Sequence, residues 1–98
     1  MVIVLASVTL QSGRLDEALA LCQEHVERSR AEAGCLAHAV HQDTEDAHRL
    51  VFVERWSDRA ALAAHFKVPA SREFVSALTT LSSAPPDMTL YEAVEITS

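Results

Sequence analysis

The sequence has few aromatic residues, few glycines and few basic residues. Three Phe, one Trp and one Tyr stand against 16 Ala in a chain of 98 residues. Because there are only two glycines, the chain has no Gly-rich loop to cradle phosphates, and we expect no nucleotide or flavin site. Eight Lys and Arg against fourteen Asp and Glu give a net charge of −6, which argues against nucleic acids and anionic membrane surfaces as partners.

Cysteine and long apolar runs are equally scarce. Cys22 and Cys35 form no metal-binding or redox motif, and we expect both in the core, where a buried thiol behaves as a small apolar group. The longest apolar run, residues 2–6, is too short to cross a bilayer and lacks the pattern of a signal peptide. We therefore expect a reduced, cytoplasmic protein with a single domain over residues 1–98.

Apolar periodicity and turn residues predict alternating strands and helices. A strand over residues 2–10 precedes an amphipathic helix that begins at Leu15 and ends before Gly34. Strands over residues 35–42 and 49–56 form a hairpin. A short helix capped by Ser57 or Asp58 runs to Phe66, a second helical piece after Pro69 is capped by Ser71, and a last strand covers residues 88–96. This order predicts an α+β, ferredoxin-like βαββαβ fold with a four-stranded antiparallel sheet.

Both faces of the predicted sheet carry apolar residues, which make up 49% of the chain. In the first strand the even-numbered residues 2–8 share one face, while Ile3 and Leu5 lie on the other; Val51 and Val53 repeat this in the third strand. Helices cover only one face, and monomers rarely expose a large apolar patch. We therefore expect a homodimer through the second sheet face, the alternative being a monomer with scattered surface valines.

Four segments resemble a known family. They are SRAEAGC at residues 29–35, FVERWSD at 52–58, AALAAH at 60–65, and the PP at 85–86 that precedes the LY at 90–91. Together they resemble the antibiotic biosynthesis monooxygenase (ABM) family of dimeric α+β barrels. That resemblance implies the fold and the dimer. The family includes cofactor-free monooxygenases of aromatic polyketides and quinols, haem-degrading enzymes, an isomerase, and members without an assigned role, so the fold alone selects no activity.

The chain departs from the family at two positions. The haem-degrading members use an asparagine on the first strand, but this chain has no asparagine, and Ala6 and Ser7 fall in that region. Their tryptophan on the short helix falls at about His65. Haem degradation is therefore not expected. The asparagine that polyketide-oxidising members use for hydrogen bonding also has no counterpart.

His65 is the candidate catalytic base. It shares a helix face with Ala61 and Leu62, and that face points toward the sheet. An imidazole there can take a proton from a phenol or a reduced quinone near neutral pH. The resemblance also places it at the histidine that follows the Glu-Arg-Trp segment in many relatives. The alternative is a structural histidine that links helix and sheet through one hydrogen bond.

Further candidates for substrate binding lie on the third strand and the short helix. Trp56 and Phe66 are candidate walls of an aromatic-binding cavity, although a large aromatic residue at a strand end also suits the core. Glu54 shares the face of Trp56 and can accept a hydrogen bond from a substrate hydroxyl. Alternatively, Glu54 pairs with an arginine such as Arg30 or Arg72.

The remaining histidines and the tyrosine are weaker candidates. His38 and His41 point to opposite faces of one strand, so they cannot chelate one ion, and we expect no metal site. His38 remains a candidate cavity residue, and Tyr91 on the last strand is a candidate hydrogen-bond donor or a packing residue. His25 falls off the apolar stripe of the first helix and is expected in solvent.

These residues favour a cofactor-independent monooxygenase that oxidises a small electron-rich aromatic, such as a quinol or an anthrone-like polyketide, with O2. His65 would act as base, Trp56 and Phe66 as walls, and Glu54, His38 and Tyr91 as binding groups. Two alternatives stay open: a non-catalytic dimer that binds a small hydrophobic ligand, and an isomerase that uses the same pocket.

Overall fold

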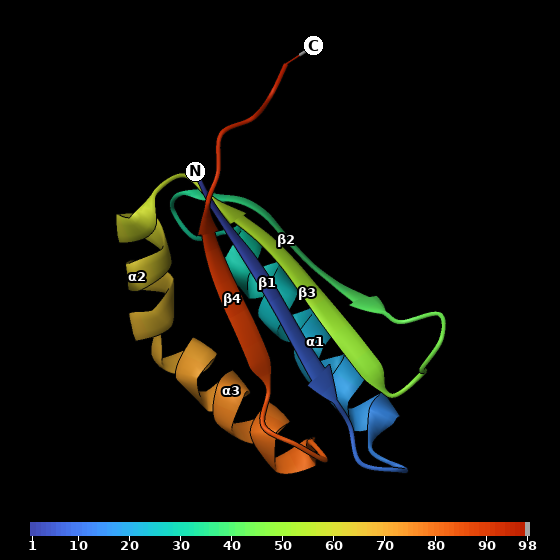
Figure 1. Cartoon of the computed structure of the whole chain (residues 1–98). Coiled ribbons are helices and arrows are strands. Elements are labelled where there is room, and N and C mark those ends of the chain that lie inside the picture. The colour runs from blue at the N-terminus through green and yellow to red at the C-terminus, as the bar shows by residue number, and fades with distance from the viewer. Residues whose placement is uncertain (98) are drawn as a thin grey trace.

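The computed structural model describes residues 1–97 and has the expected α+β, ferredoxin-like fold (Figure 1). The four strands form one antiparallel sheet in the order β2-β3-β1-β4. Three helices complete the fold. The elements are β1 (Val2–Thr9), α1 (Leu15–Arg30), β2 (Cys35–Gln42), β3 (Arg49–Trp56), α2 (Arg59–Lys67), α3 (Pro69–Leu81) and β4 (Asp87–Glu92).

Helix α3 begins three residues earlier than the sequence predicts. Ser71 was expected as its cap, but Val68 occupies the N-cap and Pro69 the start of the helix. Proline is favoured at this position because the backbone N–H groups of the first turn have no partner within the helix, so no hydrogen bond is lost where proline lacks an N–H. Ser71 consequently lies inside the helix, buried, and faces the protein interior.

The last strand is shorter than predicted and ends at Glu92 instead of Ile96. Glu92 pairs with Val2, and Met1 exchanges hydrogen bonds with Ala93 through its amino group and its carbonyl oxygen. The chain then leaves the sheet (Figure 1), and Ile96 is 93% exposed.

The helices pack on one face of the sheet. In Figure 1, α1 crosses behind the strands, and α2 and α3 follow the side of β4. The even-numbered residues of β1 and β3 point to this face, which explains why Val4, Leu50 and Trp56 are all fully buried. Burial therefore alternates along both strands, although the residues of the open face are also apolar.

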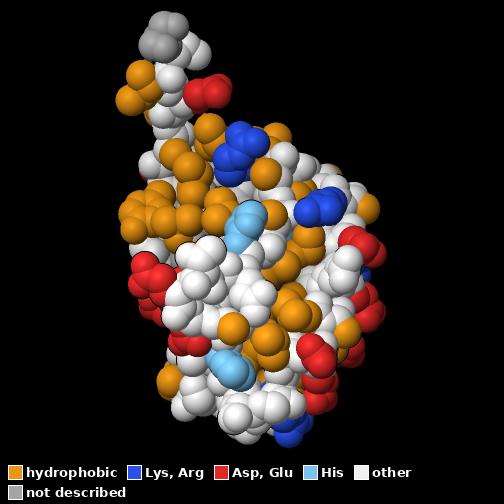
Figure 2. Space-filling view, turned by 90° about the vertical axis from the view of Figure 1, so that its right-hand side faces the viewer, with side chains coloured by type: hydrophobic (Ala, Val, Ile, Leu, Met, Phe, Trp, Pro, Cys, Tyr) orange, Lys and Arg blue, Asp and Glu red, His pale blue; other side chains and the backbone are white. Residues whose placement is uncertain are grey.

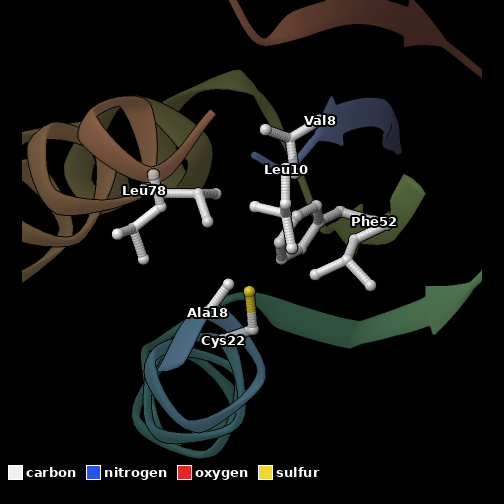
Figure 3. Packing of buried hydrophobic residues seen from close by; sticks show 8 residues of the cluster. Val8, Leu10, Ala18, Cys22, Phe52 and Leu78 are labelled. Carbon is white, nitrogen blue, oxygen red and sulfur yellow. The ribbon is translucent and has the colours of Figure 1, made fainter. Parts of the chain in front are cut away.

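The core on the helix-facing side forms two separate clusters. The larger cluster joins the ends of β1 and β3 to α1 and α3, and Figure 3 shows Cys22 of α1 and Leu78 of α3 converging with Phe52. The smaller cluster lies at the other end of the sheet, where Trp56 packs with Leu62 of α2. The expected burial of Cys22 is confirmed, and Cys35 is half-buried beside the smaller cluster.

The opposite sheet face carries no helix in the part of the chain that the structure describes (Figure 1). Leu5 on this face is 42% exposed, and its neighbours Ile3, Val51 and Val53 are half-buried. Figure 2 shows hydrophobic side chains gathered near the C-terminal tail. Among residues 1–97, none of the helices has the length and apolar character needed to cross a membrane.

Candidate active site

A polar layer lies between the two core clusters. Three histidines and one carboxylate meet there, each from a different element: His25 from α1, His38 from β2, Glu54 from β3 and His65 from α2. None of the four is more than 5% exposed. The imidazole ring centres are 5.2 Å (25–38), 5.4 Å (25–65) and 5.7 Å (38–65) apart. Buried polar side chains in such numbers need partners, and the partners determine what the layer can do.

His65 is held by a carboxylate that the sequence did not indicate. Its Nδ1 lies 2.9 Å from Oε1 of Glu32, which belongs to the turn after α1. A carboxylate only accepts hydrogen bonds, so Nδ1 carries the proton and Nε2 of the neutral ring keeps a lone pair. On one side the ring packs against Trp56, with centres 4.6 Å apart. This arrangement fixes the tautomer and the orientation that a general base requires.

The start of α2 positions His65. Asp58 is the N-cap, and its carboxylate accepts a hydrogen bond from the backbone N–H of Ala61 at 2.8 Å. Gly34, with φ +81°, lets the turn after α1 approach this helix closely. A Cβ at Gly34 would lie 2.5 Å from Cβ of Ala61. The absence of a side chain at residue 34 therefore allows the turn that carries Glu32 to approach the helix that carries His65.

Glu54 is a buried carboxylate without an arginine partner. Its Oε1 accepts a hydrogen bond from Nε1 of Trp56 at 2.9 Å and lies 3.3 Å from Nε2 of His38. No Lys or Arg of residues 1–97 lies within salt-bridge distance of it. Burial raises the pKa of Glu54, but His38, the Trp56 hydrogen bond and His65 together outweigh burial and lower the pKa. The pairing with Arg30 or Arg72, considered from the sequence, is wrong.

His25 is buried, so the prediction that it lies in solvent is wrong. It stacks on Phe74 of α3, with ring centres 3.9 Å apart and planes within 4°. Burial, reinforced by His38 and His65, lowers the pKa of His25 to about 3. Nδ1 lies 2.8 Å from a guanidinium nitrogen of Arg28, which can only donate. The neutral ring therefore carries its proton on Nε2 and acts as a hydrogen-bond donor.

A cavity of about 300 Å³ opens beside this layer, on the helix-facing side of the sheet. Its polar end is formed by His25, Glu54 and His65, and Arg72 also lines it. The remaining wall is mainly apolar and comes from β1, β3, α2, α3 and residues 86–88 at the start of β4. It comprises Ala6, Ser7, Val8, Phe52, Phe66, Ser71, Phe74, Val75, Leu78, Pro86, Asp87 and Met88. A small, mainly apolar ligand fits this size and lining.

The predicted site residues fall into three groups. His65, Glu54 and Phe66 line the cavity. His38 and Trp56 lie behind it, in contact with Glu54, so Trp56 supports the site instead of forming a wall. Tyr91 is half exposed and pairs with Ile3, on the sheet face away from the helices, and it does not line the cavity.

Two residues of the site were missed from the sequence. His25 is three residues after buried Cys22 and four before buried Ser29, so the helical spacing contained the signal. The predicted stripe of Leu15, Ala18, Leu19, Cys22 and Val26 left His25 out because it contained only apolar side chains. Glu32 lies in a turn, 33 residues from His65, and no local pattern joins the two.

Comparison with known proteins gives a consistent family and fold. Residues 1–77 match the profile of the antibiotic biosynthesis monooxygenase family. The uncharacterized protein sll1783 of Synechocystis is 31% identical over 94 residues, which are 96% of this chain and 64% of that protein. The chain therefore spans less than two thirds of that relative's length.

Two further matches cover almost the whole of this chain and all of the matched protein. YcnE of Bacillus subtilis (strain 168), named as a candidate monooxygenase, is 28% identical over 95 residues, which are 97% of this chain and 100% of that protein. A solved structure of an antibiotic biosynthesis monooxygenase has a TM-score of 0.90 at 32% identity, covering 97% of this chain and 100% of that chain.

Proposed function

Since the chain belongs to the antibiotic biosynthesis monooxygenase family, we propose that it is a cofactor-independent monooxygenase that oxidises a small electron-rich aromatic with O2. The substrate class is a quinol or an anthrone-like polyketide. The observation that supports this proposal best is the pairing of His65 with Glu32 at the polar end of an apolar cavity. A base with a fixed tautomer beside an apolar wall suits deprotonation of a flat, weakly acidic aromatic.

The chemistry requires little from the protein, because the substrate supplies the electrons. For a methylene group between aromatic rings, the balanced change is CH2 + O2 → C=O + H2O. His65 takes one proton through Nε2, and the resulting carbanion transfers electrons to O2. The peroxide that forms at that carbon takes the proton back from His65 and then loses water, which carries the second methylene hydrogen away and leaves the ketone. The four electrons that reduce O2 all come from the methylene carbon.

The other polar groups stabilise the anion and hold the substrate. His25 donates from Nε2, and a neutral donor stabilises a developing oxyanion without supplying a competing acidic proton. Glu54 accepts a hydrogen bond from a substrate hydroxyl at the same end of the cavity. His38 and Trp56 contact Glu54 and hold it in place.

Oxygen uptake with a panel of quinols and anthrones tests the proposal. We expect uptake with at least one member, reduced about 100-fold or more in His65→Ala, because general bases contribute factors of this order. His41→Ala is the matched control, since His41 is an exposed histidine of the same chain. Uptake that His65→Ala leaves unchanged would sink the role of His65, and no uptake across the panel would sink the proposed reaction.

A ligand-binding protein is the second candidate, favoured by the mainly apolar lining of the cavity. Such a protein needs no base, so its affinity should depend on Phe74 and Leu78 and not on His65. Native mass spectrometry of the purified protein, without added substrate, separates the two candidates. A retained small molecule together with no oxygen uptake favours the binder. A compound that keeps its mass but is recovered as an isomer after incubation indicates the third candidate, an isomerase.

We also propose that two chains dimerise through the open sheet face. The apolar residues on this face support it, since Leu5 is 42% exposed at the centre of the sheet and faces no helix. Light scattering should give twice the 10.7 kDa chain mass at micromolar concentration. Leu5→Lys should give the monomer while keeping the far-ultraviolet circular dichroism. A wild-type mass of 10.7 kDa contradicts the dimer.

A further inference from the structure

We propose that His25, His38 and His65 form a binding site for a divalent transition-metal ion of the zinc type. Each ring offers one nitrogen, and the three nitrogens lie within 4.8 Å of one another. This site goes beyond the proposed function, which uses no metal. The sequence excluded chelation by His38 and His41, and that exclusion stands, because His41 is exposed and lies outside the cluster.

The spacing of the rings suits a tetrahedral ion. An ion about 2.0–2.1 Å from each coordinating nitrogen places three imidazole centres roughly 5 Å apart. The observed separations are 5.2, 5.4 and 5.7 Å. The planes are inclined by 50° to 77° and do not stack, so the rings surround a common point. Side-chain rotations that draw the nitrogens together by about 1 Å complete the geometry.

The surroundings of two rings are those of metal ligands. His65 donates from Nδ1 to Glu32, the carboxylate–histidine arrangement that commonly orients a zinc ligand, and its other nitrogen stays free. His38 is 2% exposed; its Nε2 lies 3.3 Å from Oε1 of Glu54, and its Nδ1 has no hydrogen-bond partner within residues 1–97. Since a buried ring nitrogen without a partner is costly, an ion that accepts its lone pair accounts for its position.

The His25 ring and the charged side chains near the cluster determine the affinity for the ion. Arg28 donates to Nδ1 of His25, so the ion binds Nε2 of this ring. The ring proton then moves from Nε2 to Nδ1, and the half-buried Arg28 side chain loses its hydrogen bond to the ring. Two carboxylates lie beside the rings, Glu54 next to His38 and Glu32 next to His65. Two more guanidinium groups are near, since Arg72 lines the cavity and Arg30 donates to the backbone carbonyl of His38. The two carboxylates favour a bound cation, and Arg28, which contacts a ring nitrogen of His25, opposes it most directly.

The ion and the proposed reaction compete for one atom. A bound ion takes the Nε2 lone pair of His65, the same lone pair that acts as base in the proposed function. Zn²⁺ should therefore inhibit oxygen uptake, and a chelator should restore it. Borderline ligands such as imidazole also bind Cu²⁺, Ni²⁺ and Co²⁺, so Co²⁺ serves as a spectroscopic probe of the same site.

Calorimetric titration of the chelator-treated full chain with Zn²⁺ tests the site. We expect one ion per chain, with affinity reduced at least tenfold by His25→Gln, His38→Gln or His65→Gln. His41→Gln and His48→Gln are matched controls and should bind like the wild type. Cys35→Ser should also bind like the wild type, which separates the three-histidine site from a thiolate site. Absence of one-to-one binding, or equal losses in the control variants, overturns the proposal.

Co²⁺ absorption keeps the test independent of how the variants fold. The wild-type chain with one equivalent of Co²⁺ should show the intense visible bands of a tetrahedral ion, and an octahedral spectrum overturns the geometry. Circular dichroism of each variant shows whether its fold is retained. If Co²⁺ binds but no quinol or anthrone is oxidised, only the proposed function fails. If oxidation occurs and Co²⁺ gives no tetrahedral spectrum, only the metal site fails.

Discussion

Gly34 offers a direct test of how the turn after α1 and the start of α2 fit together. Its φ of +81° lies in the left-handed region, and a Cβ there would meet Cβ of Ala61 at 2.5 Å and Oγ of Ser57 at 2.7 Å. Gly34→Ala therefore adds two penalties, one from the backbone conformation and one from contact. The matched control is Gly13→Ala, where φ is +82° and nothing lies within 4 Å of the added carbon.

The two variants separate the penalties. An alanine in the left-handed region costs about 1–2 kcal/mol. Overpacking adds about 1–3 kcal/mol when backbone or short side chains must move. Gly13→Ala should therefore lower the free energy of unfolding by about 1–2 kcal/mol and Gly34→Ala by about 2–5 kcal/mol. In a domain of about this size, each kcal/mol lowers the melting temperature by roughly 4–8 °C.

Urea and thermal unfolding of both variants, followed by circular dichroism, measure the difference. We expect Gly34→Ala to be the less stable by about 1–3 kcal/mol. Oxygen uptake and Co²⁺ binding should also fall in Gly34→Ala alone, because a shift of α2 separates His65 from Glu32. Equal destabilisation by the two substitutions would refute the close approach, and a less stable Gly13→Ala would reverse the argument.

Three further predictions concern capping, burial and ionisation. Asp58→Ala removes the acceptor of the Ala61 N–H and should cost about 0.5–2 kcal/mol in urea unfolding, whereas Asp58→Asn should retain most of it. Leu50→Ala, at a fully buried position of the larger cluster, should cost about 2–5 kcal/mol, and a loss below 1 kcal/mol contradicts the packing. Burial raises the pKa of Cys22 to about 12 from an ordinary value of 9.0, so only the unfolded chain ionises between these values. The free energy of unfolding should therefore be constant below pH 9 and decrease above it, by about 1.4 kcal/mol at pH 10. Cys22→Ala should remove this decrease.

Local patterns predicted most of the fold. Strands at residues 35–42 and 49–56 match the structure residue for residue, because Gly34, the polar loop at residues 43–48 and the capping residues 57–58 mark their ends. The residue pattern predicted the wrong boundary where strand pairing ends the strand, in β4, and where proline begins the helix, in α3. β4 ends at Glu92, where its pairing with Val2 of β1 ends, although the alternation of residue types continues to Ile96. α3 begins at Pro69 because proline suits a first turn.

The site was less accessible to sequence reasoning, since it depends on contacts between distant segments. His65 and Glu54 were identified from the faces of their helix and strand, and both line the cavity. His25 was misplaced because a polar residue was assumed to point to solvent. Glu32 had no signal at all, because its role depends on a turn meeting a helix 33 residues later.

The division of the core into two apolar clusters has a consequence for how the protein can change over evolution. Each side chain of the polar layer comes from a different element, and none of them is a member of either apolar cluster. A substitution in the layer therefore alters the chemistry at one point while the scaffold at both ends of the sheet persists. New reactions become accessible through single steps, without any intermediate that must refold.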